Sequence, residues 1–354
     1  MSDKYYSILI ETVSWIIPGK FSNVQKLTCG AQGMCCTADD ETIGKIVIKK
    51  LLKPFENETN AKRAWREIVI LRHLSISPHP HIINLLDIYT SDTCLSSFNN
   101  VYLITEYGGQ NLKQSLKNVQ CYDQSSALKI IGQVVSALAY LHSGGILHRD
   151  LKPENISVSE NLEVKLLDFG LSRTASDVMS GYVITRPYRA PEVICSWTHY
   201  KATVDIWSAG CILAELLSGK ILFAGKHAVE HLQKIINFVG KPDESVLSKM
   251  TSADARNFIA KLPNPSPVSL EAHFTEVHES IIDLLRVMLT FDPDERISAK
   301  ESLQHESFRL FRATAYISSN PFGCPILDCH YDREKKDLES WKSLAWNECN
   351  KINI

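Results

Sequence analysis

Hydrophobic and polar residues in the first hundred positions follow short runs that are typical of β-strands. Three such runs, at residues 22–29, 33–40 and 45–52, are separated by glycine or polar turns. One helix interrupts the strands at residues 57–74, where a single apolar stripe recurs at helical spacing. The stripe consists of Ala61, Ala64, Trp65, Ile68 and Leu71. Residues 101–107 (VYLITEY) predict a buried strand, and residues 108–111 (GGQN) predict a flexible joint.

Helical patterns dominate after this joint. Asp123 can cap a helix that ends at Gly144 and Gly145, and residues 203–219 are apolar nearly all round, which predicts a central buried helix. Further helices are predicted at residues 280–289, 298–307 and 332–352. We therefore expect an α+β fold. It has a small β-rich lobe at residues 1–106, a larger helical lobe at residues 107–312, and an extension with a helix at residues 313–354.

Composition narrows the class of protein. With 44% hydrophobic and 22% charged residues among 354, the chain belongs to the soluble globular class. A formal net charge of -2 lacks the excess of positive charge that is typical of proteins that bind nucleic acid. The ten cysteines form neither a CxxC pair nor a Cys/His spacing suited to zinc. We recognise no secretory signal and no bilayer-spanning run, so we expect a cytoplasmic or nuclear protein without a membrane partner.

Three signatures in the middle of the chain carry chemistry. Residues 148–155 (HRDLKPEN) match the pattern HRDLxxxN, residues 168–170 read DFG, and residues 190–192 read APE. A glycine-containing loop at residues 28–33 precedes them. One such signature alone is uninformative, but all four occur in the expected order. The chain therefore resembles the protein kinase superfamily, which implies a two-lobed fold whose β-rich N-lobe carries one regulatory helix and whose C-lobe is mainly helical.

The resemblance implies phosphoryl transfer from ATP with Mg²⁺, in which the protein mainly positions groups and neutralises charge. Asp150 would accept the proton of the substrate hydroxyl, and Lys152 would touch the transferring phosphate. Asn155 and Asp168 would hold Mg²⁺, because a carboxylate and an amide oxygen suit a hard cation. His148 is expected to pack behind the catalytic loop rather than to act as an acid or base.

The same resemblance predicts a nucleotide site in which Lys49 holds the α- and β-phosphates and pairs with Glu67 of the helix. The loop departs from the pattern G-x-G-x-x-G-x-V, because Thr28 replaces the first glycine. Gly30 is retained at the position where the backbone approaches the phosphate. Gly33 is expected to let the backbone turn back into the next strand. One glycine's backbone freedom is worth about 0.5–1 kcal/mol, so we expect a working clamp. The other residues placed around the nucleotide are Leu27, Cys35, Val47, Thr105, Glu106, Gly108, Asn111 and Ser157.

Residues 180–192 (SGYVITRPYRAPE) narrow the resemblance to the MAP kinases, which carry a dual phosphorylation motif before APE. Ser180 and Tyr182 would be the acceptors, and each phosphate could order the loop by pairing with arginines. The candidate receivers are Arg63, Arg66, Arg149 and Arg173 for Ser180, and Arg186 and Arg189 for Tyr182. Segments such as GAQG, GKILFAGKH and DREKKDLESWKSL are most similar to the Jun N-terminal kinase (stress-activated) branch.

Membership of this family would imply protein substrates with Ser/Thr-Pro sites, an upstream dual-specificity MAP kinase kinase and opposing phosphatases. Three departures bear on these partners. Ser180 replaces the usual threonine, and Pro187 stands where the family normally has an aromatic residue beside the substrate pocket. Residues 311–325 also lack the acidic cluster with which MAP kinases commonly dock basic motifs.

Three alternatives are weighed against an active kinase. A pseudokinase scaffold is motivated by Thr28, Val47 and Ser157, but the lysine, both magnesium ligands and the base are all present. A P-loop ATPase is disfavoured because the pattern GxxxxGK[ST] is missing. A redox sensor built on Cys29, Cys35 and Cys36 stays open, since thiolate character cannot be read from sequence.

Overall fold

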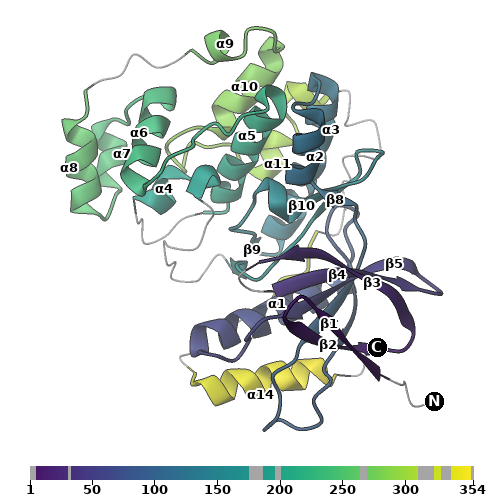
Figure 1. Cartoon of the computed structure of the whole chain (residues 1–354). Coiled ribbons are helices and arrows are strands. Elements are labelled where there is room, and N and C mark those ends of the chain that lie inside the picture. Colours follow the sequence, from purple (N-terminus) through teal and green to yellow (C-terminus); the bar gives the residue numbers. More distant parts are fainter. Residues whose placement is uncertain are drawn as a thin grey trace. The chain divides into compact units, whose positions relative to one another are not determined.

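The computed structural model describes residues 5–30, 33–174, 186–195, 201–263, 269–309, 323–327 and 336–351 (Figure 1). The chain divides into two units, which we describe separately. The first consists of Met1–Pro78, Ile83–Gly108 and Asp328–Ile354, and the second of His79–Ile82 and Gly109–Leu327. The change from the first unit to the second at Gly108 falls within the joint that GGQN predicts.

The first unit is built on a five-stranded antiparallel sheet with the strand order β3-β4-β5-β7-β6. Strands β3 (Phe21–Cys29), β4 (Gly33–Asp40), β5 (Gly44–Leu51) and β7 (Tyr102–Glu106) confirm the four predicted runs. Strand β6 (Leu85–Tyr89) and the hairpin of β1 (Tyr5–Ile10) and β2 (Val13–Pro18) are not among the predicted elements. The hairpin turns at Glu11, which has a φ of 54° and interrupts an otherwise apolar run.

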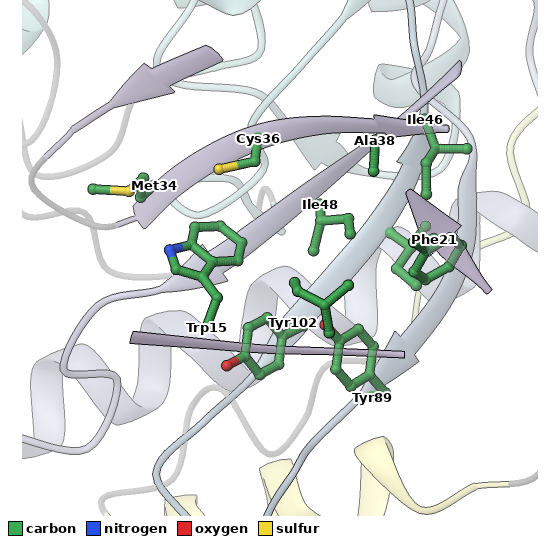
Figure 2. Packing of buried hydrophobic residues seen from close by; sticks show 11 residues of the cluster. Trp15, Phe21, Met34, Cys36, Ala38, Ile46, Ile48, Tyr89 and Tyr102 are labelled. Carbon is green, nitrogen blue, oxygen red and sulfur yellow. The ribbon is translucent and has the colours of Figure 1, made fainter. Parts of the chain in front are cut away.

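One face of this sheet packs into a hydrophobic core. Figure 2 shows Met34, Cys36 and Ala38 of β4 and Ile48 of β5 on the side of the sheet that carries Trp15 of β2. Tyr89 and Tyr102 stack with ring centroids 4.5 Å apart in the same cluster. Since side chains alternate along a strand, the odd-numbered residues of β4 and β5 lie on the opposite face.

Helix α1 (Glu58–Ile76) begins at Asn57, whose side chain accepts a hydrogen bond from the Asn60 N–H. All five residues of the predicted apolar stripe are buried. Helix α14 (Leu338–Cys349) packs along α1 within the same unit, with the rings of Trp65 and Trp341 5.1 Å apart. The helix predicted in the C-terminal extension therefore exists, and it braces the helix that carries Glu67.

The second unit is mainly helical. Its central helix α5 (Thr203–Ser218) is buried along most of its length, as the sequence predicts, and packs on α3 (Gln124–Ser143), which Asp123 caps. The other helices in the described part of this unit are α2 (Leu112–Val119), α4 (Pro191–Ile194), α6 (Ala228–Val239), α7 (Glu244–Ser248), α8 (Ala253–Lys261), α9 (Leu270–His273), α10 (Glu279–Met288) and α11 (Ala299–Ser302). The helix predicted at residues 298–307 is shorter than expected, because His305 caps a new 3₁₀ turn, η3 (Glu306–Phe308).

Short strands and turns in this unit frame the sequence signatures. Strand β10 (Ile156–Val158) pairs antiparallel with β11 (Val164–Leu166) and β8 (Gln110–Asn111), and β12 (Arg173–Thr174) pairs with β9 (Ile146–Leu147). The 3₁₀ turns η1 (Pro153–Asn155) and η2 (Arg186–Tyr188) lie in the catalytic-loop and APE segments. The predicted α+β class is confirmed. Among the described helices, none combines the length and apolarity that crossing a membrane requires.

Candidate active site

Four of the predicted nucleotide residues share one face of the sheet in the first unit. In the ladders between strands, Cys35 lies opposite Lys49, and Val47 lies opposite Thr105. Residues opposite each other in an antiparallel pair project to the same side, which here is the side away from the core. The period-2 pattern therefore places the polar Lys49 between apolar residues that could contact a flat base.

Lys49 and Glu67 are brought together by β5 and α1. The Lys49 ammonium donates to Oε1 of Glu67 at 2.5 Å, and the Glu67 side chain is only 4% exposed. Glu67 is buried although it lies off the apolar stripe, because its charge is neutralised by the lysine. This pair holds the ammonium at a fixed place on the sheet face.

The glycine loop is the turn between β3 and β4, of which residues 31 and 32 lie outside the described residues. Thr28 pairs with Cys35 inside the strand ladder, as expected, and the Gly30 N–H donates to the Gly33 carbonyl at 2.9 Å. The expectation that Gly33 eases the return turn stays a prediction. Gly33 leaves room for Lys49, since a β-carbon there would lie 3.1 Å from Lys49 Cε.

Leu27, Glu106 and Gly108 were predicted at the edges of the nucleotide site, and the structure places each of them within the first unit. Leu27 lies where the register of β3 and β4 shifts between Lys26 and Thr28. Glu106 ends β7, and its Oε1 accepts a hydrogen bond from the Asn84 N–H at 2.9 Å. Gly108 is the last residue of this stretch of the first unit. These contacts fix the strand end that precedes the joint.

Asn111 and Ser157 lie together in the second unit, where β8 pairs with β10. The Asn111 side chain caps α2 by accepting from the Gln114 N–H at 2.9 Å. The Ser157 hydroxyl donates to the Lys165 carbonyl at 3.4 Å and is buried. The polar replacement at position 157 is thus satisfied within its own hairpin, which removes one reason for expecting an inactive site.

The catalytic loop brings two polar side chains to Asp150. Oδ2 of Asp150 accepts from the Lys152 ammonium at 2.6 Å and from Nδ2 of Asn155 at 2.9 Å. Nδ2 of Asn155 also donates to the Asp150 main-chain oxygen at 2.8 Å. The carboxylate is therefore held in one orientation by two donors, which suits a group that must receive a proton at a fixed position.

Asn155 and Asp168 meet because they flank an antiparallel hairpin. Asn155 directly precedes β10, Asp168 follows β11, and the Leu167 N–H donates to the Asn155 carbonyl at 2.9 Å. Both hydrogen bonds donated by the Asn155 amide go to Asp150, which leaves Oδ1 as the acceptor atom of this side chain. An amide oxygen beside a carboxylate is a donor set that fits Mg²⁺. The residues present therefore fit the expected metal.

Two backbone positions in this site are strained. Arg149 has a φ of 66° and Asp168 a φ of 59°, a region that costs other residues of order 1–3 kcal/mol. His148, which precedes Arg149, is buried, and its Nε2 lies 3.0 Å from the Leu167 carbonyl oxygen. Its ring packs against Phe169, 5.3 Å between centroids, in agreement with the structural role expected for it.

Asp205 of α5 stabilises this strained loop, and the sequence reasoning missed it. Its carboxylate accepts from the N–H groups of His148 and Arg149 at 2.9 and 2.8 Å and from His142 at 2.9 Å. Burial by itself raises the pKa of Asp205, but the hydrogen bond and charge of His142 hold it below its usual value. Asp205 is one of two acids in an otherwise apolar helix, and this was the signal, because a buried carboxylate requires donors.

Glu192 of the APE motif is fixed by a second residue that sequence reasoning missed. Arg296 donates to both oxygens of Glu192, at 2.7 and 2.9 Å, and both side chains are fully buried. The two residues are 104 positions apart, and no local pattern links them. The pair ties the segment after η2 to the part of the unit that precedes α11.

The predicted regulatory residues are placed only in part. Ser180 and Tyr182 lie outside the described residues, as does the side chain of Arg186. Arg63 and Arg66 lie on α1, and Arg66 is buried. Arg149 is buried in the catalytic loop, where it donates to the Leu171 carbonyl at 3.4 Å. Arg173 and Arg189 are half-buried in β12 and beside η2.

Comparison with known proteins defines the class. Residues 21–308 match the family model described as the protein kinase domain. The chain therefore belongs to the protein kinases, and its β-rich and helical units are the two lobes of that fold.

Individual relatives narrow the family. Mitogen-activated protein kinase 14 of Xenopus laevis is 39% identical over 345 residues, which cover 97% of this chain and 93% of the relative. Mitogen-activated protein kinase 12 of Danio rerio shows the same identity over the same coverage. Mitogen-activated protein kinase pmk-1 of Caenorhabditis elegans is 37% identical, over 97% of this chain and 89% of the relative. The chain is a serine/threonine protein kinase of the MAP kinase family.

Proposed function

We propose that this MAP kinase transfers the γ-phosphate of ATP, with Mg²⁺, to Ser/Thr-Pro sites of protein substrates and is activated by phosphorylation of Ser180 and Tyr182. The observation that carries the proposal is the bonded set around Asp150, in which Lys152 and Asn155 donate to its carboxylate. Asp150 accepts the proton of the substrate hydroxyl while Lys152 is close enough to interact with the transferred phosphate.

The nucleotide and its metal are assigned to the residues that fit them. Lys49, held by Glu67, is assigned to the phosphate oxygens. Asn155 and Asp168 supply an amide and a carboxylate oxygen, and would hold Mg²⁺. When bound, the cation neutralises charge on the phosphates. Strain at Asp168 supports this role, because sparsely populated backbone conformations cluster at functional sites.

We assign the branch of the MAP kinase family from the three relatives rather than from the sequence segments that resemble the Jun N-terminal kinases. The three relatives are p38-type MAP kinases, so the expected Jun N-terminal kinase branch has no support among them. A p38-type role in a phosphorylation cascade implies an upstream dual-specificity kinase and opposing phosphatases as partners. We place the protein in the cytoplasm, the nucleus or both.

A radiolabelled-ATP assay tests the proposal. The full chain, co-expressed with an activating MAP kinase kinase, should label a Ser/Thr-Pro substrate, and Asp150→Asn should reduce labelling by at least about 100-fold. Asp254→Asn, at an exposed position on α8, is the matched control and should label like the wild type. Equal labelling by the wild type and Asp150→Asn would refute an active enzyme and favour a scaffold. Full activity of Ser180→Ala/Tyr182→Phe would refute the switch.

A further inference from the structure

The N-terminal hairpin of β1 and β2 is a two-stranded sheet of its own (Figure 1). Side chains from the five-stranded sheet cover the outer edge of β2. The Ile16 N–H donates to the Tyr102 hydroxyl at 3.1 Å, and the Ile16 carbonyl oxygen accepts from the Tyr89 hydroxyl at 3.1 Å. The Ser14 carbonyl oxygen accepts from the Lys50 ammonium at 2.6 Å. The main chain of this edge is thus bonded within the chain.

The outer edge of β1 differs from that of β2. Ser7 lies opposite Ile16, and Leu9 lies opposite Ser14. In an antiparallel pair, two opposite residues either bond to each other or both direct their main-chain groups away from the partner strand. Because Ile16 and Ser14 bond away from β1, Ser7 and Leu9 direct their N–H and C=O groups away from β2. Within the described residues, these outward main-chain groups have no hydrogen-bond partner.

Strand β1 also lacks the features that protect an edge strand. Its six residues, YYSILI, contain neither a charged side chain nor a proline, which are the usual means of protection. Ile8 and Ile10 pack against the core. Leu9, on the other face, is 69% exposed, and Tyr5 is 49% exposed. An uncharged strand with an open edge and exposed apolar side chains is suited to pairing with a further strand.

We propose that this edge of β1 binds a second copy of the same chain, strand against strand and antiparallel. The outward main-chain groups of both copies meet when Ser7 lies opposite Ser7 of the second copy. In this register Leu9 lies opposite Tyr5 of the second copy, and the two-fold axis repeats this pair of exposed apolar side chains. The two hairpins then form one continuous sheet.

Charge at the two ends of the hairpin also favours an identical partner. Glu11, which pairs with Lys26 but is 52% exposed, follows β1 at the hairpin turn. The exposed Lys20 lies at the opposite end, beyond Pro18, which pairs with Tyr5. Antiparallel pairing therefore sets the acidic end of one hairpin beside the basic end of the other. A strand pair of this length buries less than a standard interface, so we expect a weak dimer with a dissociation constant of about 10⁻⁴ M.

Sedimentation of the full chain tests this inference. The average mass of the wild type should rise above that of one chain as the concentration approaches about 10⁻⁴ M. Ser7→Pro removes an N–H that points away from β2, so it should keep the hairpin and raise the dissociation constant at least about tenfold. Ser7→Thr is the matched control, because it keeps this N–H and should dimerise like the wild type.

Two sedimentation results would contradict the proposed dimer. A wild type that stays a monomer at every concentration would overturn the inference and leave the edge to an extended segment of a different protein. Dimerisation of Ser7→Pro equal to that of the wild type would overturn it as well, because the dimer would then use another surface.

A cross-link provides a positive signal that misfolding cannot imitate. Opposite residues in a bonded antiparallel pair have Cα atoms about 5.5 Å apart, within the range of a disulfide. Ser7→Cys should therefore form a disulfide-linked dimer in oxidised glutathione, and peptide mapping should place the link at position 7 of both copies. Ser14→Cys, on β2, should give no more dimer than the wild type, whose own exposed cysteines set the background. Equal cross-linking of the two variants would overturn the inference.

Discussion

Gly33 lies against the aliphatic stem of Lys49: a β-carbon built on this glycine would be 3.1 Å from Lys49 Cε and 3.1 Å from the Lys50 carbonyl oxygen. The turn between β3 and β4 thus constrains the lysine that pairs with Glu67. Gly30 differs, because the nearest described atom to a β-carbon there is the Gly33 carbonyl oxygen, 3.8 Å away. Two glycines of one loop therefore have different physical reasons to be glycine.

Replacing each glycine with alanine separates these reasons. Gly33→Ala should lower the free energy of unfolding of the nucleotide-free protein by about 1 kcal/mol, because the added methyl group pushes on a lysine stem and on backbone. Gly30→Ala should leave it within about 0.5 kcal/mol, since the site is open. Urea unfolding of both variants measures the difference. Equal destabilisation by the two substitutions would contradict the steric account.

Lys49 and Lys50 are neighbours on β5 that project to opposite faces of the sheet, and substitution should affect them differently. Lys49→Met should reduce phosphoryl transfer by about 10²–10³, because a charge at the phosphates is lost. It also leaves Glu67 buried without its partner, so Lys49→Met/Glu67→Gln should regain stability but not activity. Lys50 donates to the Ser14 carbonyl at 2.6 Å, and Lys50→Met should change stability rather than catalysis. A comparable loss of kcat in both single variants would rule out the face-specific role.

The alternation of polar and apolar residues explains why this part of the site could be predicted. A period of two fixes which side chains share a face, and Cys35, Val47 and Lys49 follow from it once the strands are recognised. The hairpin that joins Asn155 to Asp168 is likewise local. Asp205 and Arg296 could not be paired with their partners from sequence, because tertiary packing alone brings these distant segments together. The contact between Gly33 and the Lys49 stem could not be predicted from sequence either, because it depends on how the strands pair.

Arg296 and Glu192 form a buried pair, and an exposed pair in the same unit offers a matched comparison. Arg296→Met leaves the Glu192 carboxylate fully buried without a counter-charge and should destabilise the protein by about 3–5 kcal/mol. Arg286 pairs with Glu271 at 2.5 Å, but both side chains are more than half exposed. Arg286→Met should therefore change stability by no more than about 1 kcal/mol. Urea denaturation compares the two, and similar losses would show that burial does not govern the strength of these pairs.

His79 gives the protein a predictable dependence on pH. Its ring is buried, stacks on Tyr140 with centroids 4.9 Å apart, and has its pKa lowered to about 3 by burial and by the charges of His81 and Lys165. Between about pH 6.5 and pH 3 the unfolded chain binds a proton at this residue that the folded chain does not, so stability falls as the pH falls. The loss should reach about 2 kcal/mol on going from pH 7.5 to pH 5, because each unit of pKa corresponds to about 1.4 kcal/mol.

The variant His79→Asn tests this dependence, because its side-chain oxygen can still accept from the His81 N–H. The difference between its free energies of unfolding in urea at these two pH values should be smaller than that of the wild type by this amount. His273→Asn, at an exposed position on α9, should retain the wild-type difference, and an equal difference in all three proteins would exclude His79 as its source.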